Sequence, residues 1–172
     1  MGGAAFPTHV KYYPPEGKQI EYVILNGAEC EPYLTCDHRL MVERTDEIIL
    51  GLLAFMKAAN AEKGMIGVEV NKPDAISALK KAAEGLPIEI IPLQVKYPQG
   101  EEKMLIYATT RRRVRACDLP IEAGVVVNNV ATAAAFGGYL KNGRPLYSRI
   151  ITVTGNGIKN PKNLEVRLGT LV

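Results

Sequence analysis

The sequence has 172 residues, a formal net charge of +3, 47% hydrophobic residues and 23% charged residues. This size and composition fit one globular domain with a substantial apolar core. The small net charge argues against a nucleic-acid-binding surface, and no run of about 18 apolar residues is present to span a membrane.

Short apolar runs alternate with helical patterns along most of the chain. The runs predict strands at residues 21–25, 65–70, 88–95 and 123–129. Apolar residues at helical spacing predict helices at about 36–60, 73–85, 101–112 and 130–140. Strands that alternate with helices predict an α/β fold, with a Rossmann-like, mostly parallel sheet and helices on both faces.

The pattern changes near the C-terminus. Residues 144–155 form a longer extended segment, and the residues after Gly155 are rich in Gly, Asn and Lys, with a turn predicted at Asn156-Gly157. We therefore expect a first domain over 1–155, and a linker or the truncated start of a small β-rich domain over 156–172. Because the pattern stops abruptly at Val172, we also expect a missing C-terminal portion.

Polar residues follow the carboxyl ends of the predicted strands, where open α/β sheets bind ligands. They are Asn26, Glu29 and Glu31 after the first strand, Gly100, Glu101 and Glu102 after the third, and Asn128, Asn129 and Thr132 after the fourth. The last three lie at a helix start, which is a natural seat for a phosphate group. Lys11 adds a positive charge, and the glutamates are acceptors for ribose hydroxyls or a carboxamide.

Each of these residues also has a purely structural interpretation. An asparagine at a strand–helix junction is commonly an N-cap, and acids in the first turn of a helix complement its dipole. The bare "GGAA" at residues 2–5 lacks the spacing of a dinucleotide-binding fingerprint. The three cysteines form neither a disulfide framework nor a zinc or iron–sulfur ligand set, so we expect free thiols, no metal site and a reducing, cytosolic compartment.

Five segments in order carry a family resemblance: "GGAAFPTHVK", "NGAECEPYLTCDHRLM", "NKPDAI", "YPQGEEKMLIYA" and "GVVVNNVATAAA". Together they closely resemble the RnfC family, a component of Rnf electron transport complexes. They more distantly resemble the flavin-bearing subunit of respiratory complex I. The resemblance extends over nearly the whole chain.

The resemblance implies a domain that holds FMN and accepts NAD(H). The family's glycine-rich segment, which packs against the flavin and nicotinamide rings, falls on Gly2, Gly3 and Ala4. The remaining cofactor-binding positions of the family fall on Phe6, Lys11, Asn26, Glu29, Gly100, Glu101, Glu102, Asn128, Asn129 and Thr132. No residue is assigned a catalytic role, because a flavin supplies the redox chemistry itself.

The resemblance also implies a place in a larger assembly. The whole complex would couple electron transfer between NADH and ferredoxin to ion pumping, with 4Fe–4S clusters in the missing C-terminal region. The chain would contact other subunits, and ferredoxin only indirectly, on the cytoplasmic face of the cell membrane. Alternatives are a related flavoprotein that reduces cobalamin or serves proline reductase, and a flavin-free scaffold module.

Overall fold

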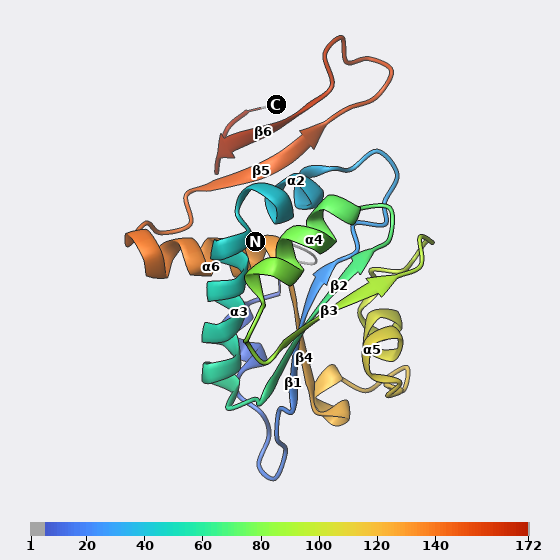
Figure 1. Cartoon of the computed structure of the whole chain (residues 1–172), viewed down its shortest axis with the longest axis vertical. Coiled ribbons are helices and arrows are strands. Elements are labelled where there is room, and N and C mark those ends of the chain that lie inside the picture. Colours follow the sequence, from blue (N-terminus) through green and yellow to red (C-terminus); the bar gives the residue numbers. More distant parts are fainter. Residues whose placement is uncertain (1–5, 172) are drawn as a thin grey trace.

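The computed structural model describes residues 6–171 and has a parallel sheet as its centre (Figure 1). The sheet has four strands in the order β3-β2-β1-β4, and every neighbouring pair is parallel. Its strands are β1 (Tyr22–Gly27), β2 (Lys63–Glu69), β3 (Ile88–Leu93) and β4 (Val125–Asn129). The predicted α/β class with a parallel sheet is confirmed.

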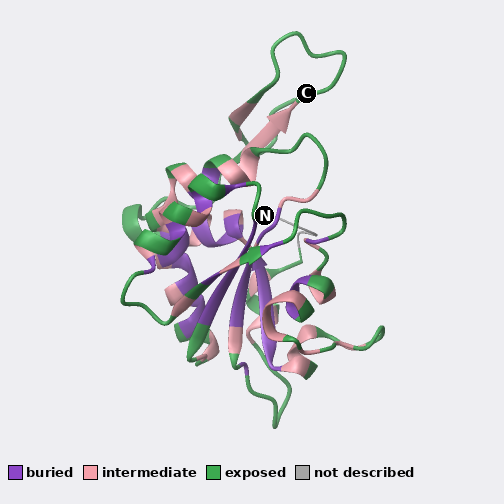
Figure 2. Cartoon of the chain, turned by 45° about the vertical axis from the view of Figure 1, so that its right-hand side comes forward, coloured by how far each residue is buried: buried purple, intermediate pink, exposed green. Residues whose placement is uncertain are grey.

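Helices cover both faces of this sheet, as predicted, but they do so unequally (Figure 1). One face packs against α2 (Cys36–Glu43), α3 (Thr45–Ala59), α4 (Pro73–Ala82) and α6 (Val130–Asn142), and the other against α5 (Glu102–Thr110) and the 3-10 turn η1 (Pro120–Ala123). Successive side chains of β1 point to opposite faces of the sheet, which explains how both cores form. Val23 and Leu25 join the larger core, whereas Ile24, between them, joins the smaller one. The strands are accordingly mostly buried (Figure 2).

Two helices differ from the sequence expectation. The helix predicted over 36–60 is interrupted at Arg44, whose backbone leaves helical geometry, so α2 and α3 are separate helices. The hydroxyl of Thr45 donates to the carbonyl of Met41 at 2.6 Å, which satisfies an acceptor at the end of α2. A short helix that was not predicted, α1 (Thr8–Lys11), lies before β1.

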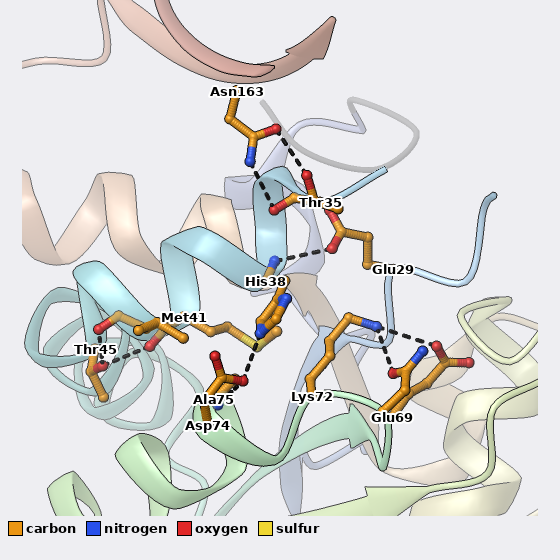
Figure 3. A network of polar contacts seen from close by, with 12 residues as sticks. Glu29, Thr35, His38, Met41, Thr45, Glu69, Lys72, Asp74, Ala75 and Asn163 are labelled. Carbon is orange, nitrogen blue, oxygen red and sulfur yellow. Dashed lines mark hydrogen bonds and ion pairs between the residues drawn. The ribbon is translucent and has the colours of Figure 1, made fainter. Parts of the chain in front are cut away.

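A separate antiparallel pair forms the C-terminal part of the fold. It consists of β5 (Ser148–Val153) and β6 (Lys162–Arg167), so the extended segment 144–155 supplies a strand to this second sheet. The predicted turn at Asn156-Gly157 is present between them. The carboxamide of Asn163 bonds to the hydroxyl and carbonyl of Thr35, which fixes the pair beside the start of α2 (Figure 3). The predicted domain boundary at residue 155 falls inside this hairpin and stays a prediction.

Candidate functional site

The candidate site lies where the chain changes direction across the sheet. From β1 the chain crosses to β2 over the face that carries α2 and α3, whereas it reaches β4 from β3 over the face that carries α5. The carboxyl ends of β1 and β4 therefore flank a topological switch point, which is where open α/β sheets bind ligands. Asn26 is the penultimate residue of β1, and Asn128 and Asn129 end β4.

A pocket of about 600 Å³ opens at this point. Its floor is the edge strand β4, and the N-terminal segment from Phe6 to Pro15 forms one wall. Apolar side chains line most of it, and the polar exceptions are Thr8, Lys11, Asn26, Glu102, Asn128, Asn129 and Thr132. An apolar hollow with a few convergent polar groups is the usual form of a small-molecule site.

Most of the predicted site residues that the structure describes meet in this pocket. Its lining includes Phe6, Lys11, Asn26, Gly100, Glu102, Asn128, Asn129 and Thr132. Glu29 and Glu101 are not among the lining residues. Gly2, Gly3 and Ala4 lie outside the described residues. The structure thus brings three strand-end segments and the N-terminal segment together, while the ligand-binding role of each residue stays a prediction.

The two glutamates outside the lining act as helix caps. Both carboxylate oxygens of Glu29 accept backbone N–H groups at the start of α2, from Asp37 at 2.7 Å and from His38 at 3.0 Å. The carboxylate of Glu101 accepts the N–H of Met104 at 2.8 Å and caps α5. These contacts satisfy orphan donors of the two helices. A purely structural role, helix capping, therefore accounts for the observed contacts of Glu29 and Glu101.

Gly100 is held against the end of β1 by two contacts. The Asn26 side chain donates to the carbonyl of Gly100 at 2.8 Å, and the N–H of Gly100 points to the Cys30 sulfur at 3.3 Å. A Cβ at position 100 would lie 3.3 Å from that sulfur and 3.5 Å from Nδ2 of Asn26. Such tight spacing leaves little room for a side chain, so a glycine here keeps the loop close to the strand.

Lys11 places a positive charge between two elements of the pocket. Its Nζ donates to the carbonyl of Val127 at 2.7 Å and lies 3.5 Å from the Glu102 carboxylate. The same ammonium lies 6.0 Å from the centre of the Phe6 ring. The Glu102 contact is partly exposed and therefore weak, so it competes little with an anionic or electron-rich ligand for the ammonium, which can keep its bond to Val127.

The start of α6 forms the other polar end of the pocket. The carboxamide oxygen of Asn129 accepts the N–H of Ala131 at 2.8 Å, and its nitrogen donates to the carboxylate of Asp37 at 2.7 Å. The side chain of Asn128 donates to the hydroxyl of Tyr12 at 2.6 Å. Burial raises the pKa of this phenol, so Tyr12 is neutral at physiological pH. Both asparagines are therefore fixed by neighbours that the sequence analysis did not single out.

A second pocket, of about 670 Å³, lies between α6 and the β5–β6 pair. Of the predicted residues it contains only Thr132, so we assign the candidate site to the first pocket. Near both pockets, side-chain atoms of Glu29, Cys36 and Asp37 lie within 4.8 Å of one another. Helix capping by Glu29 explains this cluster, and we assign no metal to it. The three cysteines, Cys30, Cys36 and Cys117, are free thiols, as expected.

Comparison with known proteins identifies the family. A family model described as the Nuo51 FMN-binding domain matches residues 1–137. The chain belongs to the Nuo51 FMN-binding domain family. None of the helices in residues 6–171 combines the length and apolar character needed to cross a membrane.

Two curated relatives agree with the resemblance seen in the sequence. The C subunit of the proton-translocating ferredoxin:NAD(+) oxidoreductase complex of Clostridium ljungdahlii is 51% identical over 170 residues, which is 99% of this chain and 37% of that protein. The C subunit of the Na(+)-translocating ferredoxin:NAD(+) oxidoreductase complex of Acetobacterium woodii is 52% identical over 170 residues, which is 98% of this chain and 38% of that protein. The chain thus spans little more than a third of these relatives.

A solved structure with the same fold is that of an NAD+-reducing [NiFe]-hydrogenase in the H2-reduced state. It superposes on 98% of this chain and 34% of its own, with a TM-score of 0.81 and 24% sequence identity. At this identity the likeness establishes the fold of this member of the Nuo51 family and nothing about its ligands. The Rossmann-like arrangement predicted from the sequence is therefore confirmed.

Asp37, beside the pocket of this Nuo51 family member, is among the residues that the sequence did not reveal. Burial raises the pKa of its carboxyl from 3.8 to about 6, while the hydrogen bond from Asn129 acts in the opposite direction. The nearby carboxylate of Glu29 adds to the increase, and Arg149 of β5 opposes it. Its position in the first turn of α2 was readable in the sequence, but its pairing with α6 was not.

We expect Asp37→Asn to stabilise the protein at neutral pH. The folded protein retains the Asp37 proton between about pH 4 and pH 6, where the unfolded chain loses it, so Asp37 lowers the free energy of unfolding as pH rises through that window. The variant should be more stable than wild type by about 1–3 kcal/mol at pH 7.5. Urea unfolding at pH 7.5 and pH 4 measures this; a difference of the same size at both pH values would contradict it.

Proposed function

We propose that this domain binds FMN and accepts NAD(H), as one part of an ion-translocating electron-transport complex of the Rnf type. The observation that carries the proposal is the pocket at the β1–β4 switch point, where apolar walls and the polar groups of Lys11, Asn128 and Asn129 converge. Membership of an FMN-binding family supports the same conclusion.

The pocket suits a flat ring system with a phosphate at one end. Its volume of about 600 Å³ lies within the range of about 300–1,000 Å³ usual for small-molecule sites. The exposed side chains of Phe6, Val10 and Leu119 offer the apolar surface that a ring needs. The start of α6, a helix of 13 residues, offers backbone N–H groups and a positive dipole end to a phosphate.

In this proposal the protein residues bind and orient the ligands, and the cofactor supplies the redox chemistry. When bound, a flavin exchanges a hydride with nicotinamide and passes electrons on one at a time. Lys11 would neutralise negative charge on the ligand, and Asn26 would keep the Gly100 loop close to β1. In the whole protein, electrons would pass between the flavin and ferredoxin through iron–sulfur clusters outside this chain, on the cytoplasmic face of the membrane.

A fluorescence titration with FMN tests this assignment. Lys11→Met should raise the Kd for FMN by about tenfold or more, because a hydrogen bond to a charged group contributes about 1.5–3 kcal/mol. Lys57→Met is the matched control, since Lys57 is exposed near the end of α3. An unchanged Kd in Lys11→Met, or no FMN binding by the wild type, would contradict the proposed function.

A further inference from the structure

Glu69, the last residue of β2, and Lys72, directly before α4, form a buried ion pair (Figure 3). Their side chains are 2% and 7% exposed, and Nζ of Lys72 lies 3.3 Å from Oε2 of Glu69. Among the described residues, these are the charged side chains that the fold buries. Removing two charges from water is costly, and a buried ion pair is weak evidence for stability alone. The pair therefore calls for an explanation beyond stability.

The contacts of the pair connect three strand-end segments. The Lys72 ammonium also donates to the carbonyl of Ala28 after β1, at 2.9 Å, and to the side chain of Asn71 after β2, at 3.2 Å. The other carboxylate oxygen of Glu69 accepts the N–H of Lys96 after β3, at 3.2 Å. Together with the bond between Lys72 and Glu69 themselves, these contacts join the ends of β1, β2 and β3.

Two of the segments held in this way continue directly into the pocket. Ala28 lies between Asn26, which lines the pocket, and Glu29, which caps α2. The segment that starts at Lys96 leads to Gly100 and Glu102, which also line it. The buried side-chain oxygen of Gln99 has no hydrogen-bond partner among the described residues, so this side chain does not anchor the segment through it. Glu69 thus holds the start of this segment at Lys96, while Asn26 and Cys30 hold it further along at Gly100.

We propose that Glu69 and Lys72 are positioning residues of the ligand pocket, although neither lines it. They fix the spacing between the Asn26–Glu29 segment and the Lys96–Glu102 segment, and the Asn26–Gly100 hydrogen bond depends on that spacing. The inference rests on the proposed FMN function for its effect on binding. Its effect on the two segments is independent of any ligand.

Amide hydrogen exchange and FMN titration of Lys72→Met test the proposal together. Exchange should accelerate at least tenfold at residue 28 and at residues 96–101, but not in α6. The amides of residues 28, 96 and 100 are hydrogen-bonded in the native structure, so their exchange reports the loosening of the two segments. The Kd for FMN should rise about tenfold. Lys80→Met, the same change at an exposed position of α4, should alter neither measurement.

A double variant keeps the test valid if Lys72→Met fails to fold because Glu69 is left unpaired. Glu69→Leu with Lys72→Met removes both charges, a type of replacement that is often tolerated, and it also removes the contacts with Ala28 and Lys96. Unchanged exchange in the two segments, equal acceleration throughout the sheet, or faster exchange with unchanged FMN affinity would each overturn the positioning role. If the wild type binds no FMN, the proposed function fails; localised acceleration would then still support the hold of Glu69 and Lys72 on the two segments, and unchanged exchange would overturn it.

Discussion

Gly137→Ala is expected to destabilise the protein by about 3 kcal/mol or more, because no side chain fits between α3 and α6 at this position. A Cβ there would lie 1.9 Å from the carbonyl oxygen of Glu47 and 3.0 Å from the backbone nitrogen of Gly51. Both are main-chain atoms, so the only relief is to move the helices apart. Urea unfolding at pH 7.5 gives the loss in free energy.

The neighbouring glycine provides a matched control. At Gly138 an added Cβ would lie 3.4 Å from the end of the flexible Glu47 side chain, which can turn away. Alanine is also a better helix former than glycine by about 1 kcal/mol. Gly138→Ala should therefore keep or slightly raise stability. If both variants unfold at the same urea concentration, close packing of α3 against α6 is not what requires glycine at position 137.

The tight packing of these helices also has a consequence for the pocket. Gly51 repeats the contact from the other helix, since a Cβ there would lie 2.0 Å from the carbonyl oxygen of Ala133. With α6 held this closely, its first turn has one position relative to β4. Asn129 and Thr132 at that turn are thereby set in place by close helix contacts further along α6, at Ala133 and Gly137.

The sheet and most helices could be predicted because their signals are local. Apolar runs such as 123–129 and helical spacing such as 73–85 depend on near neighbours in the sequence, so the elements followed, with shifts of a few residues at their ends. The interruption at Arg44 was missed although residues 43–47 are all polar, because the apolar residues on either side, such as Leu40 and Ile48, still lie at helical spacing. The strand β6 was not predicted, although the turn before it was, because residues 162–167 carry few apolar side chains.

The location of the site could be predicted from the sequence, but most of the contacts within it could not. Parallel strands end at one edge, so the meeting of Asn26, Gly100 and Asn128 followed from topology once the strands were assigned. The capping by Glu29 was not foreseen, because the sequence does not show that its carboxylate returns to α2, eight and nine residues later. Asp37 and the Glu69–Lys72 pair were missed because their partners lie on other elements.

Asn129→Asp is expected to raise the Kd for FMN at least tenfold. Aspartate caps a helix as well as asparagine does, so α6 itself should persist. The new carboxylate would, however, face the Asp37 carboxylate across a contact that is now 2.7 Å, and it would repel a phosphate at the helix start. FMN affinity by fluorescence titration, with riboflavin as a ligand that lacks the phosphate, separates the loss of phosphate binding from damage to the ring site.

The exchanged pair Asp37→Asn with Asn129→Asp separates charge from pairing. An amide at 37 can donate to a carboxylate at 129, which restores a hydrogen bond in the reverse direction with the same total charge, so stability should recover relative to Asn129→Asp alone. FMN binding should stay weak, because the negative charge now lies at the start of α6, while riboflavin binding should be close to wild type. Full recovery of FMN affinity in the exchanged pair would mean that the phosphate is bound elsewhere, since moving a charge to the helix start would then have no effect on it.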